Sequence, residues 1–278
     1  MQLLIRYLGD WRSFFPGGTA GILQLMYPPL GAAIGAQSDF FANPFGRVYR
    51  SIPQIWATVL QKGGAERAKR IRDLHRTING KDRHGQDYRA LEPETWWWAH
   101  ATFTWEVFES IRLFHLGGLA RVDLERLYAD TVEWYRLYGV FYDGVPGDYR
   151  SFCDRFDMFC RTRLEMTPSA KHTLGLALAG DWRPPLVRSS FRNPVLRNAG
   201  RIVVTGTLPE PVRERFGIPW PASDQRWFER ICRLGRWGFA AVPRFANRRG
   251  MQFVMRYVGA ATRPERFLPP PSTPVRSS

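Results

Sequence analysis

Apolar residues recur at helical spacing along almost the whole chain, and this pattern constrains the fold more than any other feature of the sequence. Only residues 201–207 alternate in a way that suits a β-strand. The chain has 278 residues, 44% of them hydrophobic, which is enough to bury a core without disulfides or a structural metal. We therefore expect an all-α fold, a single large helical domain with little or no sheet.

Proline and glycine mark where the expected helices begin and end. Asn43 and Pro44 predict a helix start, with Asn43 as N-cap, and Pro53 is expected to start or kink a second segment, 53–62. The most apolar stretch, 18–36, is interrupted by prolines and glycines and predicts a buried helix pair. Further helices are expected at 65–78, 94–114, 123–138, 149–164, 174–179, 210–216 and 224–239, with a polar loop at 81–93.

No repeat and no clear linker divides the chain, so one domain is expected over 1–262, followed by a Pro/Ser-rich disordered tail at 263–278. Cys153 and Cys160 lie seven residues apart on an expected helix, or about 10 Å along its axis, which is too far for a disulfide. The odd number of cysteines and the lack of a leader-like apolar start predict a cytoplasmic protein.

The formal net charge is +15, and arginine supplies most of it. Such an excess suits either solvated arginine faces or an anionic partner. Nucleic acid is not an expected partner, because no helix-turn-helix, RRM or zinc pattern is present. Peripheral contact with an anionic membrane stays open. The common phosphate-loop, dinucleotide, serine-hydrolase and zinc-protease motifs are also absent.

Two histidines stand out by their positions on expected helices. His75 lies with Leu74 on the apolar line that Ala68 and Ile71 begin on an otherwise basic helix. It is therefore either a hydrogen-bonded core residue or a metal or haem ligand. His100 is expected to face the buried side of its helix, opposite a polar stripe of Thr102, Glu106 and Glu109. It has the same two interpretations. The three other histidines are assigned no role.

Arg47 and Ser51 are four residues apart, with Arg50 between them, and share a helix face if 43–51 is helical. They are either a surface arginine with an N-cap serine, or a positively charged, hydrogen-bonding cover over a reactive oxygen species or a haem propionate.

The order of several short motifs resembles that of a known family. The motifs are Asn43-Pro44-Phe-Gly-Arg47-x-x-Arg50-Ser51, Leu74-His75-Arg-Thr-Ile-Asn-Gly80, Tyr88-Arg-Ala90-x-x-Pro93, Trp98-Ala-His100-Ala-Thr102, Leu208-Pro209-x-x-Val-Arg213 and Gly217-Ile-Pro219-Trp220. Together, over residues 18–250, they resemble the family of the latex-clearing protein (rubber oxygenase) and the fungal oxygenase MpaB. The resemblance implies an all-α fold with a globin-like core, haem b bound to a histidine, and O₂-dependent cleavage of carbon–carbon double bonds in polyisoprenoids.

The resemblance also implies roles for individual residues. His75 would be the proximal iron ligand, and Arg47 and Ser51 would take the family's Arg and Thr places beside the distal pocket. Arg50 stands where the rubber-cleaving enzyme has a lysine able to cap the iron. His100 lies in the family's Trp-x-His-Ala-Thr motif, either at the cofactor or as a structural residue.

The sequence departs from the family pattern at three points. Ser51 replaces a threonine, Pro53 is expected to interrupt the helix, and residues 1–46 contain no glutamate that could serve as the base of the rubber oxygenase. The resulting hypothesis is a haem b-dependent oxygenase that uses O₂, an unidentified electron donor and an apolar, isoprenoid- or lipid-like substrate. The alternative is a non-catalytic helical protein of the same family that binds haem, lipid or a membrane surface.

Overall fold

The computed structural model describes residues 1–36, 40–42, 44–181 and 193–260, with the backbone alone for 44–50, 254 and 256–260. Within these residues the chain forms thirteen α-helices, one 3₁₀ helix and one two-stranded sheet, so the all-α prediction is confirmed. In chain order the elements are α1 (Gln2–Leu8), η1 (Trp11–Phe14), α2 (Gly17–Met26), α3 (Pro28–Gly35), α4 (Pro44–Leu60), α5 (Gly64–Leu74), β1 (Asn79–Lys81), β2 (Asp87–Arg89), α6 (Pro93–Phe114), α7 (Arg121–Arg136), α8 (Tyr149–Thr162), α9 (Pro168–Leu178), α10 (Pro194–Thr207), α11 (Glu210–Arg215), α12 (Ala222–Ala241) and α13 (Arg244–Ala260).

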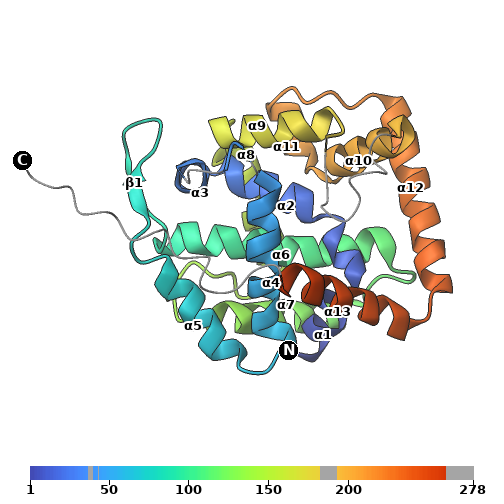
Figure 1. Ribbon diagram of the computed structural model, residues 1–278, viewed down its shortest axis with the longest axis horizontal. Helices are drawn as coiled ribbons and strands as arrows, with labels where there is room; N and C mark the ends of the chain where they lie inside the picture. Colours follow the sequence, from blue (N-terminus) through green and yellow to red (C-terminus); the bar gives the residue numbers. More distant parts are fainter. Residues whose placement is uncertain (37–39, 43, 182–192, 261–278) are drawn as a thin grey trace, which may run out of the picture.

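Helix α6 crosses the middle of the molecule, with α9 and α10 on one side and α7 on the other (Figure 1). It begins at Pro93, whose fixed φ suits the first helical turn. Helices α2, α7 and α12 and the 3₁₀ helix η1 pack against it. Because it is covered on nearly every side, the expected exposed polar stripe is wrong: Thr102, Glu106 and Glu109 are only 0%, 2% and 8% exposed.

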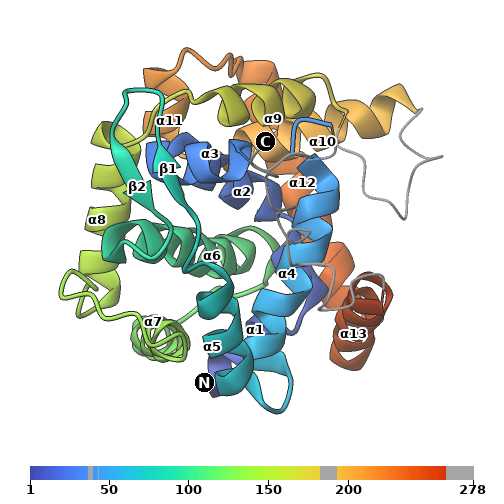
Figure 2. The same ribbon diagram turned by 60° about the vertical axis from the view of Figure 1, so that its left-hand side comes forward.

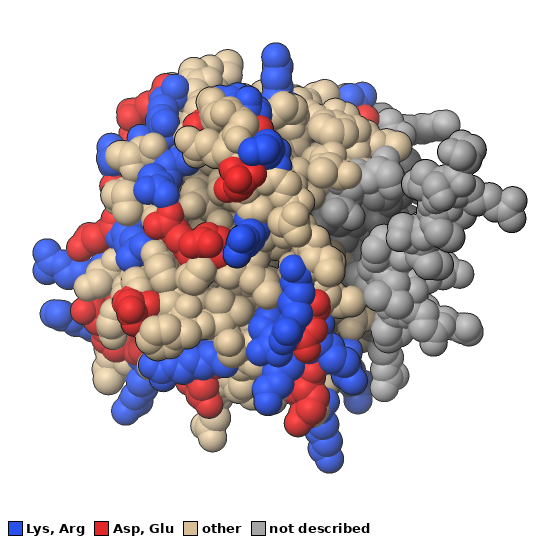
Figure 3. All heavy atoms as spheres, turned by 90° about the vertical axis from the view of Figure 1, so that its left-hand side faces the viewer, with Lys and Arg blue, Asp and Glu red and all other residues tan. Residues whose placement is uncertain are grey.

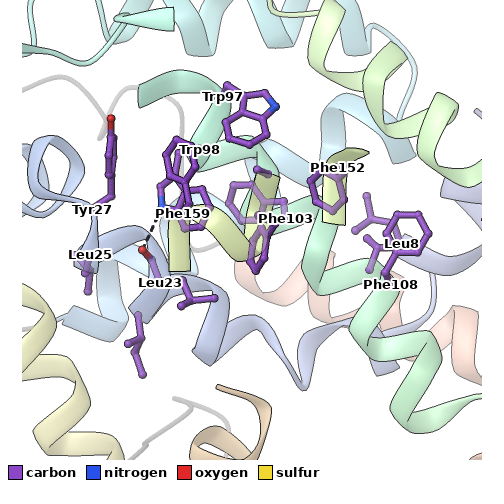
Figure 4. Close-up of a cluster of buried hydrophobic side chains, with 14 of the residues drawn as sticks. Leu8, Leu23, Leu25, Tyr27, Trp97, Trp98, Phe103, Phe108, Phe152 and Phe159 are labelled. Atoms are coloured by element: carbon purple, nitrogen blue, oxygen red, sulfur yellow. Dashed lines mark hydrogen bonds between the residues drawn. The ribbon is translucent and has the colours of Figure 1, made fainter. Parts of the chain in front are cut away.

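Stacked aromatic rings join α6 to α8 and α2 in the main core. The Trp98 ring lies 4.7 Å from that of Phe159 at an angle of 11°, and 5.0 Å from that of Phe156. The indole Nε1 of Trp98 donates a hydrogen bond to the Leu23 carbonyl oxygen at 3.2 Å (Figure 4). Large rings thus fill the space between three helices, and the one polar atom of the indole has its partner.

Residues 201–207, which suit a strand by sequence, lie in α10, so the strand expectation is wrong. The helix begins at Pro194, and the Asn193 side chain accepts a hydrogen bond from the Val195 amide at 2.8 Å. Further along, α10 packs closely on α12. The absence of a side chain at Gly206 permits this approach, since a Cβ there would overlap the Phe228 ring. Burial against neighbouring helices outweighs the strand propensity of the β-branched residues here.

The region between the expected helices 65–78 and 94–114 also differs from expectation. Helix α5 ends at Leu74, and a short antiparallel hairpin follows in place of the polar loop. Gly80 pairs with Tyr88, which is the buried residue of β2. Three-residue strands carry too few alternating positions to be found from the sequence.

Helix α4 continues through Pro53, so the expected break at this residue is wrong. A proline inside a helix removes one backbone donor but does not always end the helix. The helix pair expected at 18–36 is confirmed as α2 and α3. The Asn43 cap and the boundary and tail near 263 lie outside the described residues. In the part of the chain that is described, no helix is long and apolar enough to cross a membrane.

Candidate functional site

Helices α4 and α5 form an antiparallel pair that carries the first group of candidate site residues (Figure 2). The chain reverses at Gly63, whose φ of 74° lies in the left-handed region that favours glycine. Across the pair, the Arg67 guanidinium donates to the Gln54 side-chain oxygen at 2.8 Å. This contact fixes the register of the two helices near the turn.

This register places Ser51 and His75 at the same end of the helix pair. At 1.5 Å of rise per residue, Ser51 lies roughly 14 Å and His75 roughly 17 Å from the turn. Arg47 and Arg50 belong to the same end of α4, where the backbone alone is described. Ser51 is half-buried. The backbone therefore groups all four of these candidate residues at one end of the pair.

His75 is the C-cap residue of α5 and is half-buried. Its Nδ1 lies 2.7 Å from the Ile71 carbonyl oxygen. A carbonyl only accepts, so Nδ1 carries the hydrogen and the lone pair is on Nε2. The Trp96 ring of α6 meets the imidazole edge-on at 5.2 Å. These contacts set both the tautomer and the orientation of the ring. The expected apolar line is only partly realised, because Leu74 is 40% exposed.

A run of rings connects His75 to His100 through the interior. Trp96 lies edge-on to Tyr138 at 5.4 Å, and Tyr138 in turn lies 6.4 Å from the His100 ring. Burial raises the pKa of Tyr138 to about 12. The two candidate histidines are thus joined by packed, uncharged aromatic side chains.

His100 is buried, as expected from its helix position, and is held in place by α7. Its Nε2 donates to the Thr131 carbonyl oxygen at 2.9 Å, and the Trp134 ring meets the imidazole edge-on at 4.7 Å. Burial lowers the pKa of His100 to about 4, which keeps it neutral near pH 7. The cavity beside it has a volume of about 10 Å³, room for about one water molecule.

Glu106, which the sequence predicts on a polar stripe with no catalytic role, is a buried carboxyl group. Burial raises its pKa well above the ordinary value of 4.5. Its Oε2 has no hydrogen-bond partner among the described residues. Its Oε1 lies against the first turn of α2, where a Cβ at Gly17 would be 2.8 Å away. Burial without a partner in the described part of the chain therefore favours the protonated form of this carboxyl group.

We expect Glu106→Gln to raise the free energy of unfolding near pH 8 and to flatten its dependence on pH. Because the folded pKa is raised, the folded chain holds a proton that the unfolded chain releases above pH 4.5. Stability therefore falls as the pH rises from 4.5 towards the folded pKa, by up to about 1.4 kcal/mol per pH unit. Urea unfolding at several pH values measures this slope.

Glu109→Gln is the matched control for this variant. Glu109 lies one turn further along α6 and accepts 2.6 Å and 2.7 Å hydrogen bonds from the Arg112 guanidinium. Its replacement breaks an ion pair and is expected to lower stability. An unchanged pH slope in Glu106→Gln would mean that this carboxyl group is ionised in the folded chain.

Two of the remaining histidines, His84 and His115, contact residues outside the candidate site. His84 is exposed and lies with Arg83 on the Glu165 carboxylate, at 2.9 Å and 2.5 Å. His115 packs edge-on to Tyr7 at 5.2 Å, and burial lowers its pKa to about 4. The described residues contain no cluster of three or more His, Cys, Asp or Glu side chains that could hold a metal ion.

The surface near the β-hairpin and α5 carries both signs of charge. Figure 3 shows acidic side chains spread among the basic ones over this face. On α5, for example, Asp73 pairs with both Arg72 and Arg76, at 2.8 Å and 2.9 Å. Exposed pairs of this kind contribute little to stability, and they lower the local positive potential. This face is therefore not a uniform basic surface.

Fold and site together define an all-α protein with an oriented histidine at one end of a helix pair, the end at which α4 carries Arg47 and Arg50. Residues 5–237 match the model of the family described as ER-bound oxygenase mpaB/B′/rubber oxygenase, catalytic domain. The chain belongs to this family of oxygenase catalytic domains, and the resemblance expected from the motifs is confirmed. No curated protein and no solved structure matches the chain.

Proposed function

We propose that the chain is a haem b-dependent oxygenase in which His75 ligates the iron, and that it acts with O₂ on an apolar, isoprenoid- or lipid-like substrate. Family membership supports oxygenase chemistry. The observation that carries the haem assignment is the 2.7 Å contact of the His75 Nδ1 with the Ile71 carbonyl. This contact leaves Nε2 as the basic nitrogen, and a hydrogen bond of this kind raises the basicity of a metal-bound imidazole.

The surroundings of His75 fit a haem ligand on two further counts. The residue is only half-buried, so it lies at the margin of the packed core. Trp96 restrains its rotation from the other side. Contacts that fix the orientation of an imidazole would favour its use as a haem ligand. When bound, haem supplies the redox-active iron that the side chains of this chain lack.

Residues of α4 would act at the same bound group as His75. Arg47 and Ser51 share one helix face and would donate hydrogen bonds to negative charge that develops on oxygen, or to a propionate. Arg50, one residue before Ser51, would cover the iron in place of the family's lysine. The aromatic core would exclude water from an apolar substrate. We assign His100 to helix packing, because the cavity at its side is only about 10 Å³.

The same proposal includes an unidentified electron donor and a cytoplasmic location. The three cysteines are all free, which suits a reducing compartment. A non-catalytic haem- or lipid-binding role is the second candidate, and it is favoured by the lack of glutamate in residues 1–46. Turnover of O₂ by the haem-loaded chain separates the two roles.

Titration of the purified chain with haemin tests the proposal. We expect a Soret band that saturates at one haem per chain and persists through gel filtration. A chain that stays colourless, or that loses the colour on the column, would overturn the haem assignment.

Arg47→Ala is expected to leave haem content unchanged and to lower turnover by about 10²-fold, the usual effect of removing one fixed donor to developing negative charge. Arg50→Ala is expected to change the resting absorption spectrum instead. The matched control is Arg70→Ala, an exposed arginine on α5. Unchanged turnover and spectra in both α4 variants would assign these arginines to the solvated surface.

A further inference from the structure

Helices α12 and α13 carry large apolar side chains that are exposed to solvent and do not contribute to the core. Their buried face is formed by Phe228, Cys232 and Met251. Six other apolar residues on the two helices and their junction are exposed: Trp227 53%, Leu234 73%, Trp237 63%, Val242 39%, Phe245 62% and Phe253 62%. Helix α12 lies at the outer edge of the molecule in Figure 1, and α13 lies at the outer edge in Figure 2. Exposed apolar groups gathered on one side of a soluble fold mark a surface that contacts something else.

Arginines lie among these apolar residues. Residues 226–253 contain seven arginines and one acidic residue, Glu229. Arg236 is used within the fold, since it donates to the carbonyl oxygens of Leu113 and Arg112 at 3.2 Å and 3.1 Å. The other six form no ion pair with a carboxylate in the described part of the chain: Arg226, Arg230, Arg233, Arg244, Arg248 and Arg249. Their charge is therefore available to an anionic partner.

Two of these arginines lie over exposed rings. The Arg230 guanidinium is 5.3 Å from the centre of the Trp227 ring, and that of Arg249 is 5.7 Å from the centre of the Phe245 ring. Such a pair places an apolar ring and a phosphate-binding guanidinium side by side on the surface. This combination suits the boundary between lipid headgroups and acyl chains.

An apolar groove of about 540 Å³ runs between the two helices on this side of the molecule. Glycines form much of its wall, and at Gly238 a Cβ would meet open space. At the floor of the groove, the Asn247 side-chain oxygen accepts a hydrogen bond from the Trp11 indole at 2.9 Å, which ties α13 to η1. The groove is thus a fixed part of the fold that continues the exposed apolar surface inwards.

We propose that this α12–α13 face docks the protein on the surface of an anionic lipid bilayer, without spanning it. The exposed rings would enter the headgroup boundary and the six arginines would bind lipid phosphates. A second copy of the chain fits less well, because a symmetric dimer would bring the same arginines together. Single-stranded nucleic acid also fits less well, because its bases would stack on the exposed rings but leave Leu234 and Val242 without an apolar partner.

Vesicle sedimentation tests the proposal on the full chain. We expect binding to vesicles that contain phosphatidylglycerol, little binding to pure phosphatidylcholine, and weaker binding as salt increases. Arg230→Gln with Arg233→Gln should lower the partition coefficient roughly 25-fold, about fivefold per arginine. Leu234→Ser with Trp237→Ser should abolish binding at moderate salt.

Matched pairs from other surfaces serve as controls. Phe141→Ser with Val195→Ser removes two apolar side chains that are 81% and 71% exposed, and Arg121→Gln with Arg136→Gln removes two exposed charges from α7. Both controls should bind as the parent does. Equal binding to the two vesicle types, equal losses in the controls, or release of bound protein by a single-stranded oligonucleotide would overturn the proposal. So would a dimer in solution that the Leu234 and Trp237 changes convert to monomer.

Discussion

Replacing Trp98 with alanine is expected to lower the free energy of unfolding by about 3–5 kcal/mol. The side chain is fully buried and stacks on Phe159 and Phe156, so its removal leaves a cavity between α2, α6 and α8. It also leaves the Leu23 carbonyl without its 3.2 Å donor. Rigid rings on both sides limit how far the site can collapse.

Urea denaturation followed by circular dichroism measures this loss. Trp98→Phe keeps most of the volume but removes the indole donor, so it should cost less than the alanine variant. Trp237→Ala removes an indole that is 63% exposed and should change stability by less than about 0.5 kcal/mol. A loss below about 1 kcal/mol in Trp98→Ala would mean that these three helices do not form the core.

The second large effect is expected at His75. His75→Gly should lower haem affinity by at least about 10²-fold, since changes to residues that only support a metal ligand already cost 10–100-fold. Added imidazole should occupy the vacated space and restore the Soret band. Haemin titration of the parent and the variant, with and without imidazole, measures both effects.

Three histidine variants complete that experiment. His84→Ala and His115→Ala should retain haem, because these side chains interact with Glu165 and Tyr7 instead. His100→Ala should retain haem affinity but lose stability, since it removes the Thr131 hydrogen bond inside the core. Loss of haem in His100→Ala together with its retention in His75→Gly would reverse the ligand assignment.

Helical spacing predicted the fold class and most of the helices, because nearly every helix buries one face and exposes the other. The spacing of apolar residues was least informative for helices that are buried on more than one face. In α6 both faces are covered, so Glu106 and Glu109 looked like an exposed stripe although they are buried. In α10 the sequence shows a run of β-branched residues that suits a strand, whereas the close packing of Gly206 on Phe228 of α12 appears only in the structure.

The candidate site was predictable in part because its residues lie close together along the chain. The turn at Gly63 brings residues separated by more than 20 positions to one end of a helix pair. The end of α5 at Leu74 was not predictable, because the apolar spacing continues to Ile78 in the sequence. The contact of His75 with Trp96 was not predictable either, because it depends on packing against α6. Glu106 could have been found only from the burial of both faces of α6.

The most direct test of the central claim is the resonance Raman spectrum of the ferrous, haem-loaded chain. Ligation by His75 predicts an iron–histidine stretching band that shifts when histidine is labelled with a heavy nitrogen isotope. In His75→Gly reconstituted with unlabelled imidazole, the band should return and no longer respond to labelling of the protein. A band that stays sensitive to labelled histidine in His75→Gly, or one that disappears in His100→Ala, would contradict the assignment of His75 as the iron ligand.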